Sequence, residues 1–342
     1  MRILVTGANG HIGSNVVRAL IAAGYDVRAF VREGCDRRGL AGLSLEYVFG
    51  DVMDQTSLET ALTGCDAVIH LAAVYKTIAT NADEIVAPAI LGAENLYAAA
   101  KAAGIQRIVY TSSIASVGFS YKANQFRTGD DWNDDPHNPY YIAKTRSEQR
   151  VQHLARETGI HTVVICPAIV LGANDYRVTP SNQLVMDWLN GIGQTYQGGL
   201  NLVDVRDVAA AHVAALTKGE NCRRYIVGGQ NILVKDIGQL LKKMTGIRPI
   251  HVPFPRGIML VTARLLEGVC KRIKVKPPFT YDLLYEVSDR YAWYDCQDTY
   301  NTFGLKPYTA EQTLRASVDW LLQTDRIRPS RAHRISARLA AA

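Results

Sequence analysis

The sequence lacks the features that mark membrane-spanning, disulfide-linked and repeat proteins. Its 342 residues contain no apolar run of the ~18–20 residues that a membrane span needs, and no internal repeat is evident. The six cysteines are scattered without a C-x-x-C pair, which argues against a disulfide frame or a zinc site, and no histidine and carboxylate cluster suggests another metal. The start "MRILVTG" reads as a strand rather than a signal peptide. We therefore expect a cytoplasmic protein with reduced thiols, no metal and no stable membrane insertion.

Charge is moderate in amount and uneven in distribution. Charged residues make up 20% and hydrophobic residues 48%, as in soluble globular proteins. Five arginines and no acidic residue lie in 326–342, so the rest of the chain is close to neutral although the net charge is +6. A uniformly basic face for nucleic acid is therefore not expected. We interpret 326–342 as a basic, flexible tail, with a weak contact to an anionic partner or membrane surface as the alternative.

Strand-like and helical patterns alternate over the first half of the chain. Between most of the short apolar segments lie helical patterns, such as "NVVRALIAAG" and "EIVAPAILGAENLYAAAKAAG". This order predicts an α/β fold in which a doubly wound parallel sheet is covered by helices on both faces, as in the Rossmann fold. The six predicted strands lie in "RILVT", "YDVRAFVR", "LEYVFGDV", "AVIHLAA", "RIVYTSS" and "TVVICPAIVLG".

The alternation weakens after about residue 173, which predicts a smaller, interleaved C-terminal substrate lobe. We assign 1–172 and 200–228 to the dinucleotide-binding domain, and 173–199 and 229–325 to the substrate lobe. Within this lobe, "GIMLVTARLLEGVCKRIK" (257–274) is apolar with a basic end. A buried helix is the favoured interpretation, and a helix at a membrane interface is the alternative.

A glycine-rich turn follows the first predicted strand. The stretch "TGANGHIG" places Gly7, Gly10 and Gly13 in G-x-x-G-x-x-G spacing directly before a helical pattern. Small residues let the backbone approach a pyrophosphate, and the helix N-terminus favours its negative charge. Because the turn lies between a strand and a helix, we predict that it binds a dinucleotide.

The end of the second predicted strand indicates which dinucleotide is bound. An acidic residue there accepts hydrogen bonds from the ribose of NAD, whereas arginine accommodates the 2′-phosphate of NADP. The stretch "AFVREGCDRR" supplies Arg32, Arg37 and Arg38, and arginine binds phosphate through two parallel hydrogen bonds. Glu33 is a contrary signal, one position beyond the expected acid. We predict NADP(H), with NAD(H) as the less favoured alternative; the arginines could also form only a solvated loop.

Two adjacent tyrosines begin another predicted helix. In "NPYYIAKT", Asn138 is a good N-cap and Pro139 suits the first helical position. Residues four apart share a helix face, so Tyr140 meets Lys144 whereas Tyr141 does not. Spacing alone leaves two readings open: a proton donor with a lysine that tunes its pKa, or an ordinary amphipathic helix.

Two serines end the fifth predicted strand. Ser112 and Ser113 lie in "YTSSIASVG", and ligands of open α/β sheets bind beyond the carboxyl ends of the strands. A serine at this place is also a common helix cap. Its occurrence together with the glycine turn and Tyr-x-x-x-Lys favours a catalytic set.

These motifs give the chain a resemblance to the extended short-chain dehydrogenase/reductase family over roughly residues 1–325. "TGANGHIG", "HLAA", the strand-end serines and Y-x-x-x-K occur in the family's order. "VAPAILGAENL" and "CPAIVLGAND" resemble the dihydroflavonol-reductase-like branch. "GLNLVDVRDVA" and "YIVGGQNILVKDI" resemble bacterial proteins named hopanoid-associated sugar epimerases.

The resemblance implies a role for each matching residue. Tyr140 would be the proton donor, and Lys144, with the oxidised nicotinamide, would favour its phenolate form. Ser113, rather than Ser112, would hydrogen-bond the substrate carbonyl. Asp51 and Val52 would lie near adenine, and the residues implied in cofactor binding are Gly7, Gly10, His11, Ile12, Gly13, Arg32, Arg37, Arg38, Asp51, Val52, Leu71, Ala72, Ala73, Thr111, Ser112, Tyr140, Lys144, Pro167 and Ile169.

Three functions share this machinery. We favour an NADPH-dependent reductase of an aldehyde or ketone over an NDP-sugar epimerase or dehydratase with retained NAD(P). After the sixth strand those sugar enzymes carry an arginine and an asparagine, and Cys166 stands where the asparagine is expected. A non-catalytic dinucleotide-binding protein is the third reading, although such proteins often lose the tyrosine or lysine that this chain keeps.

The substrate is predicted from the irregular lobe. An apolar or aromatic carbonyl compound is our expectation, and we expect a monomer or homodimer. His212, in "AAAHVAAL", is read as a helix residue rather than a ligand. The aromatic and sulfur side chains that could form an apolar pocket wall, or else pack ordinarily, are Tyr75, Tyr176, Met186, Trp188 and Tyr196.

Overall fold

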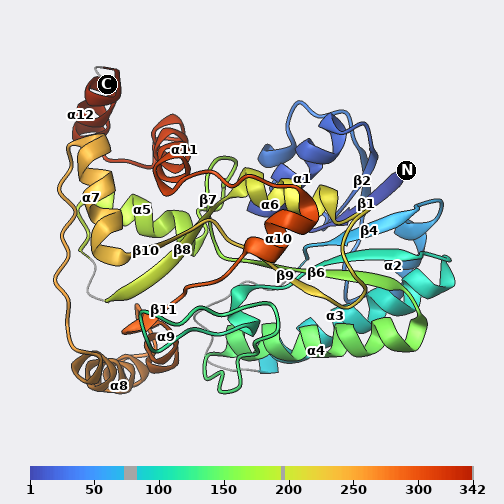
Figure 1. The fold of residues 1–342 in the computed structure, drawn as a ribbon, viewed down its shortest axis with the longest axis horizontal. Helices are drawn as coiled ribbons and strands as arrows, with labels where there is room; N and C mark the ends of the chain where they lie inside the picture. Colours follow the sequence, from blue (N-terminus) through green and yellow to red (C-terminus); the bar gives the residue numbers. More distant parts are fainter. Residues whose placement is uncertain (73–82, 194–196, 341–342) are drawn as a thin grey trace.

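The computed structural model describes residues 1–72, 83–193 and 197–340, and shows two sheets with their helices (Figure 1). The larger sheet has the strand order β3-β2-β1-β4-β5-β6-β9, and every neighbouring pair is parallel. Its strands are β1 (Arg2–Thr6), β2 (Asp26–Val31), β3 (Glu46–Phe49), β4 (Ala67–His70), β5 (Arg107–Thr111), β6 (His161–Pro167) and β9 (Arg224–Val227).

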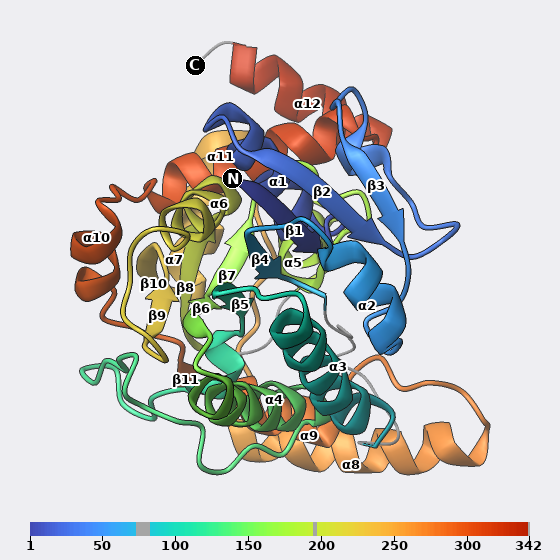
Figure 2. The ribbon, with the colours of Figure 1, turned by 90° about the vertical axis from the view of Figure 1, so that its right-hand side faces the viewer.

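Helices cover both faces of this sheet, as the sequence predicts. Helices α1 (His11–Ala22) and α6 (Val205–Ala214) pack together on one side, and α2 (Gln55–Leu62), α3 (Asp83–Ala102) and α4 (Pro139–Thr158) pack together on the other (Figure 2). Strands buried on both faces need a continuous apolar run, and Ile3, Leu4 and Val5 are all fully buried. The predicted doubly wound α/β fold is confirmed.

The strand order places a crevice at one edge of the sheet. The chain builds β1, β2 and β3 outward in one direction, and then returns to place β4 on the other side of β1. The connections that leave β1 and β4 therefore diverge, and ligands of open α/β sheets bind at such a switch point beyond the carboxyl ends of the strands.

The second sheet belongs to the smaller lobe. It consists of β10 (Gln230–Leu233), β8 (Gly198–Asp204) and β11 (Arg290–Tyr291), with β7 (Ile169–Leu171) also paired to β8. The lobe core includes Trp188, Leu241 and Leu314, all fully buried. The remaining elements are η1 (Arg38–Leu40), η2 (Ile114–Ser116), α5 (Pro180–Asn190), α7 (Val234–Thr245), α8 (Arg256–Arg272), α9 (Tyr281–Val287), α10 (Gln297–Phe303), α11 (Ala310–Gln323) and α12 (Pro329–Ala340).

The boundary between the two parts differs from the expected one. The segment "TVVICPAIVLG" forms two strands rather than one, because the chain changes sheets at Ala168. Strands β7 and β8, which we assigned mostly to the dinucleotide-binding domain, form the second sheet. In the other direction, Phe303 of α10 packs against Tyr225 of the main sheet, with the ring centroids 4.7 Å apart. The lobe is thus interleaved more deeply than the sequence pattern indicates.

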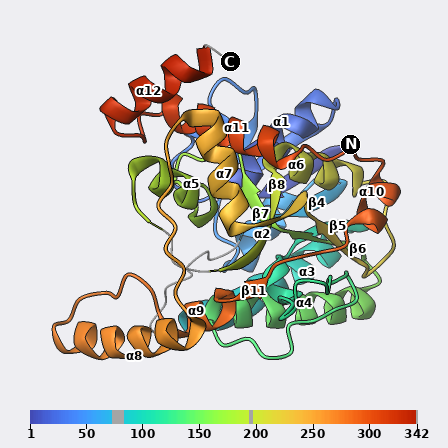
Figure 3. The same cartoon turned by 60° about the vertical axis from the view of Figure 1, so that its left-hand side comes forward.

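Two C-terminal segments differ from their predictions. The segment expected to be a flexible tail forms α12, whose fully buried Ile335 joins the lobe core and whose Arg331 donates to the carbonyl of Leu189 at 3.0 Å. Helix α8, expected to be buried, contributes Met259, Ala263 and Cys270 to the interior but leaves much of its apolar surface exposed. Its ribbon lies at the outside of the molecule (Figure 3). Among the described residues, no helix combines the length and hydropathy required to cross a membrane.

Candidate functional site

The glycine turn between β1 and α1 leaves no room for side chains. A Cβ on Gly13 would lie 2.2 Å from the carbonyl oxygen of Gly7, and a Cβ on Gly7 would lie 2.8 Å from the amide nitrogen of Ala72. Gly7 also has a φ of +67°, which glycine adopts without strain. Gly10 is the N-cap of α1 and offers no side-chain hydrogen bond to it. The helix therefore presents N–H donors that a pyrophosphate can accept from, and this cradle fits a dinucleotide.

Hydrogen bonds to Thr6 join the end of β1 to the end of β4. Thr6 Oγ1 accepts hydrogen bonds from the amides of Leu71 and Ala72, both at 3.2 Å, and contacts His70 Nδ1 at 2.9 Å. Because the oxygen accepts both amides, its own proton goes to Nδ1, which makes His70 a neutral imidazole. Burial lowers the pKa of His70 to about 3, with a further contribution from the cation of Lys144. Ala73, a predicted cofactor contact, lies outside the described residues.

His11 and Ile12, the first two residues of α1, both pack against other parts of the protein. Ile12 is partly buried against the main core. His11 is buried, and its Nδ1 lies 3.9 Å from Oδ2 of Asp175. Burial lowers the pKa of His11 despite this neighbour and so favours the neutral imidazole. His11 thereby places the start of α1 next to Asp175, in the segment before α5.

The three arginines after β2 have different surroundings. Arg38 forms an ion pair with Asp36 at 2.7 Å, which lowers the pKa of that carboxyl to about 2, and it lies over the Tyr176 ring. Arg37 lies over the rings of Tyr47 and Phe49, 5.3 and 5.6 Å from their centroids. Arg32 is exposed directly after β2, and no acidic side chain in residues 1–72, 83–193 and 197–340 pairs with it.

Asp51 and Val52 follow β3 at the same edge of the sheet. Asp51 Oδ1 accepts from the amide of Met53 at 3.0 Å, and the carbonyl of Val52 accepts from Asn95 at 3.1 Å. Both residues are partly exposed. These two hydrogen bonds hold the backbone of the loop after β3 in place.

Tyr140 and Lys144 begin α4, whose start follows from the sequence. The side chain of Asn138 accepts from the amide of Tyr140 at 3.0 Å, and Pro139 occupies the first turn, so the predicted cap is confirmed. Lys144 Nζ donates to the carbonyl of Thr111, the last residue of β5, at 3.1 Å. The side chain of Ser113 lies beside the phenol of Tyr140 and lowers its pKa. The helix face thus meets the carboxyl end of β5.

Burial dominates the protonation of this pair. It raises the pKa of Tyr140 to about 12, against a smaller lowering by the side chain of Ser113. It lowers the pKa of Lys144 to about 8, opposed by the carboxylate of Glu148. Desolvation of the charged form is thus the largest influence on both pKa values. Tyr140 is a neutral phenol that can donate a proton.

The two serines have separate partners. Ser113 Oγ accepts from the amide of Ala115 at 3.2 Å as the cap of η2, and it contacts Tyr140. Ser112 is buried, and its hydroxyl donates to a carboxylate oxygen of Glu148. Ser113 is therefore the partly exposed hydroxyl of the two, whereas Ser112 is enclosed and bound to Glu148.

A buried ion pair behind the site was not anticipated from the sequence. Glu148 lies one turn beyond Lys144 on α4, and its carboxylate accepts from Arg224 Nε of β9. Arg224 Nη2 also donates to Ser116 Oγ at 3.1 Å, and Ser116 donates to Glu148 at 2.5 Å. The guanidinium of Arg224 lies 3.8 Å from the centroid of the Trp132 ring. The only sequence signal was the four-residue spacing from Lys144 to Glu148.

The predicted helix residue His212 supports β5 from the other face. Its Nδ1 donates to the carbonyl of Val208 at 2.7 Å, so Nε2 accepts from Thr111 Oγ1 at 2.8 Å. Burial lowers the pKa of His212 to about 4. The side chain is thus a neutral buried imidazole on α6.

The residues beyond β6 lie where the two parts meet. Pro167 ends β6 opposite Val227, and Ile169 contacts both hydrophobic cores. Tyr176 lies edge-on to Trp320, with ring centroids 4.9 Å apart, and Met186 packs against the lobe core. Trp188 is fully buried in that core, so it is a packing residue rather than pocket wall. Tyr75 and Tyr196 lie outside the described residues.

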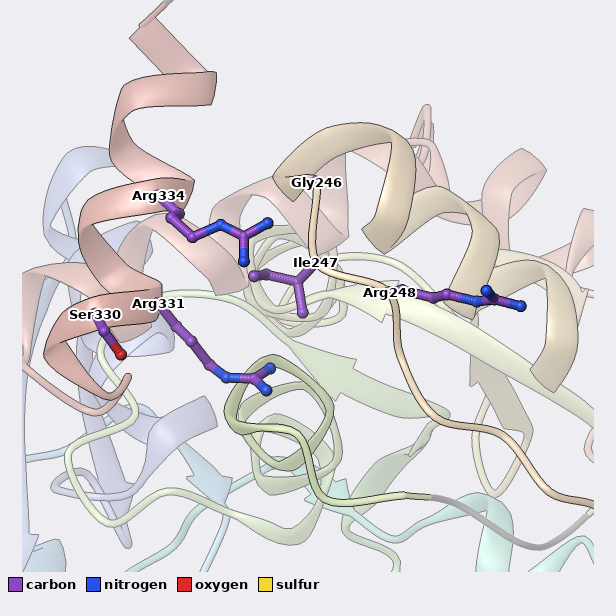
Figure 4. Close-up of a pocket in the computed structure, with 6 residues that line it drawn as sticks. All are labelled: Gly246, Ile247, Arg248, Ser330, Arg331 and Arg334. Atoms are coloured by element: carbon purple, nitrogen blue, oxygen red, sulfur yellow. The ribbon is translucent and has the colours of Figure 1, made fainter.

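A hollow of about 390 Å³ between the end of α7 and α12 is separate from this site (Figure 4). Its arginines do not converge on one point, because Arg248 extends away from Arg331 and Arg334. It contains none of the predicted catalytic or cofactor-binding residues; its lining is Gly246, Ile247, Arg248, Ser330, Arg331 and Arg334.

Comparison with known proteins agrees with this geometry. The profile of the "NAD dependent epimerase/dehydratase family" matches residues 3–228, which is more than half of the chain. The chain belongs to the NAD-dependent epimerase/dehydratase family. The resemblance to extended short-chain dehydrogenases/reductases is thereby confirmed, and the protein is an NAD(P)-dependent oxidoreductase.

Relatives of this family align over most of the chain. Sterol demethylase protein B of Methylococcus capsulatus is 33% identical over 79% of this chain and 80% of its own. A Synechocystis sp. protein named after dihydroflavonol 4-reductase is 31% identical over 92% of this chain and 93% of its own. The crystal structure of gox2253 superposes with a TM-score of 0.84 at 29% identity, covering 95% of this chain and 99% of that one.

Replacing Gly13 by alanine tests the dinucleotide cradle. The added Cβ would displace the carbonyl of Gly7, so we expect Gly13→Ala to weaken NADPH binding at least tenfold in calorimetric titration. Gly268→Ala is the matched control, because its Cβ meets nothing within 4 Å and its affinity should not change. Equal affinities in the two variants would contradict this role of the turn.

Proposed function

We propose that the protein is an NADPH-dependent reductase that converts an apolar or aromatic aldehyde or ketone to an alcohol, with Tyr140 as the proton donor. The observation that carries this proposal is the meeting of Tyr140, Ser113 and Lys144 at the carboxyl end of β5. Ser113 lies beside Tyr140 and lowers its pKa, and Lys144 Nζ donates to the carbonyl of Thr111 at 3.1 Å. This edge of the sheet adjoins the glycine turn that fits the dinucleotide.

Each side chain has a definite task in this reaction. When bound, the nicotinamide supplies a hydride equivalent to the carbonyl carbon. Ser113 Oγ donates a hydrogen bond to the carbonyl oxygen and stabilises the negative charge that grows there. Tyr140, kept protonated by burial, transfers its phenolic proton to that oxygen. The cation of Lys144 stabilises the phenolate that remains.

The supporting groups hold these atoms in place. Thr111 is fixed from two sides, since His212 binds its hydroxyl and Lys144 binds its carbonyl. Glu148 holds Ser112 and Ser116, which flank Ser113 on the turn after β5. Such fixed positions reduce the reorganisation needed during proton transfer.

Arg32 supports NADP(H) as the cofactor. It is exposed at the end of β2 without an acidic partner among the described side chains, whereas Arg38 is held by Asp36. A free guanidinium at this place can bind a 2′-phosphate through two hydrogen bonds. The dihydroflavonol-reductase-named relative is consistent with a cofactor that is consumed in each turnover.

Epimerisation of a nucleotide sugar is the second candidate, because the family description includes epimerases and dehydratases. Such an enzyme needs polar groups around the sugar. Cys166, however, is fully buried, and its Sγ lies 3.9 Å from a carboxylate oxygen of Glu148 rather than in an open position. A protein that is stabilised against heat by a UDP-sugar and consumes no NADPH with any carbonyl compound would support the epimerase instead.

Tyr140→Phe tests the proton donor. We expect the NADPH consumption rate with a panel of aromatic and aliphatic aldehydes and ketones to fall at least a hundredfold, while the dissociation constant for NADPH changes little. Tyr141→Phe is the matched control, because Tyr141 is buried beside Tyr140 and lacks the lysine one turn away. Full activity of Tyr140→Phe would rule out the proposed mechanism.

The pH dependence tests the charge of Lys144. Because the pKa of Lys144 is lowered to about 8, its cation is present below that pH and is lost as the pH rises through it. We expect kcat/KM for NADPH, which reports groups of the free enzyme, to be level below pH 7 and to fall above about pH 8. Lys144→Arg, whose side chain stays charged, should lack this fall in its residual activity. A wild-type profile that is level to pH 10 would contradict the assignment.

Replacing Arg32 tests cofactor choice. Arg32→Ser removes the free guanidinium, and we expect the dissociation constant for NADPH to rise about tenfold or more while that for NADH stays unchanged. Arg38→Ser is the comparison, because Arg38 already pairs with Asp36 and should contribute less. Wild-type binding of NADH as tight as that of NADPH would overturn the proposed preference.

A further inference from the structure

Helix α8 exposes a continuous apolar stripe on the outside of the substrate lobe. Ile258, Val261, Leu265 and Val269 recur at helical spacing, and between 56% and 67% of each residue is exposed. Ile273, at the end of the helix, extends the same stripe and is 61% exposed. Single exposed apolar residues are ordinary, but a row along one helix marks an interaction surface.

The opposite face of α8 explains how the helix stays attached. Met259 and Ala263 pack against Leu284 of α9 in a separate small core. Arg264 lies over the Tyr281 ring, 4.1 Å from its centroid, and Glu267 accepts from the amide of Tyr281 at 2.9 Å. The exposed stripe is therefore not needed to hold α8, whose ribbon lies at the outer edge of the molecule (Figures 1 and 3).

Positive charge accompanies the stripe. Residues 248–276 contain seven basic residues and one acidic residue, a net charge of +6 that equals that of the whole chain. Lys271, Arg272, Lys274 and Lys276 are all exposed at the C-terminal end of α8, next to Ile273. Apolar and basic side chains are thus combined on one exposed helix.

We propose that α8 docks the protein on the surface of a membrane that contains anionic phospholipids. The stripe from Ile258 to Ile273 would lie at the boundary between headgroups and acyl chains, about 5–10 Å deep. The four basic residues at its end would bind the lipid phosphates, since each basic side chain near an anionic surface strengthens attachment. This is attachment at the interface, and it requires no membrane-spanning segment.

The charge pattern disfavours a second copy of the chain as the partner of α8. Two parallel α8 helices would bring their basic ends together. In an antiparallel pair, Lys271 and Arg272 would lie beside 256–266 of the other copy, which contains no acidic residue. Neither arrangement offers an acidic partner to the basic end of α8, whereas anionic lipid does.

Docking through α8 would bring the catalytic helix close to the membrane. The buried carboxylate of Glu286 on α9 accepts from the amides of His137 and Asn138, at 2.6 and 3.2 Å, directly before α4 and Tyr140. Helix α9 therefore contacts both α8 and the start of α4. Carbonyl compounds dissolved in the bilayer would meet the protein on this side.

Vesicle flotation of the full-length protein tests the proposal. We expect the wild-type protein to float with vesicles of equal parts phosphatidylglycerol and phosphatidylcholine, to bind pure phosphatidylcholine at least tenfold more weakly, and to lose binding in high salt. Leu265→Glu should lower the partition coefficient at least tenfold, because a carboxylate then faces the acyl chains. Leu91→Glu, at an exposed apolar position on α3, should have no effect.

A charge-matched pair of variants isolates the basic end of α8. Lys274→Glu with Lys276→Glu should lower binding to the anionic vesicles at least tenfold. Arg328→Glu with Arg334→Glu removes the same charge from the region of α12 and should leave binding within twofold. All variants should keep the wild-type melting temperature and the wild-type rate with a water-soluble carbonyl compound, which separates docking from folding and from the reductase proposal.

Three outcomes would overturn the proposal. The first is the absence of flotation with anionic vesicles. The second is equal loss of binding in the α12 variant, which would assign the contact to the tail. The third is a wild-type dimer in sedimentation that becomes a monomer in Leu265→Glu without any lipid binding, which would make the stripe an interface between copies of this chain.

Discussion

The carboxylate of Glu148 and the guanidinium of Arg224 form the interaction on which the arrangement of the site depends. This pair joins α4 to β9 inside the protein, and it also binds Ser112 and Ser116 on the turn that carries Ser113. Removing one partner of such a buried pair leaves an uncompensated charge and typically costs about 3–5 kcal/mol. Helix α4 and the turn after β5 are therefore held at a fixed separation. The pair thereby links the main sheet to the segments that carry Tyr140 and Ser113.

Desolvation shifts the pKa values of several buried groups of the candidate site. Burial keeps His70 and His212 neutral, raises the pKa of Tyr140 to about 12 and lowers that of Lys144 to about 8. The neutral imidazoles serve as hydrogen-bonding supports for β4 and β5, since each is bound to a threonine hydroxyl. Under the proposed mechanism, proton transfer falls to Tyr140, whose pKa the neighbouring Ser113 also influences. Burial thus keeps the two imidazoles in structural roles beside the proposed proton donor.

The substrate lobe combines a rigid core with an open outer surface. Its own core is closed by α12, whose Ile335 is fully buried, so the basic end of the chain is anchored by apolar contact. Helix α8 has the reverse character, because its apolar residues remain outside. Both helices have basic and apolar residues at helical spacing, and only the presence of a neighbouring element distinguishes them. Helix α12 packs against α7, whereas the stripe of α8 faces outward.

Local patterns in the sequence determined the α/β fold, the glycine turn and the start of α4. These features depend on residues close in the chain: apolar runs for buried strands, small residues for a tight turn, and Asn138 and Pro139 for a helix cap. The tertiary structure alone decided that Ser112 binds Glu148, that the chain changes sheets at Ala168, and that Arg38 pairs with Asp36 while no described acidic side chain pairs with Arg32. Glu148 and Arg224 lie 76 residues apart, so no local pattern marks their contact. Contacts between residues so far apart in the sequence form only when the sheet and its helices pack together.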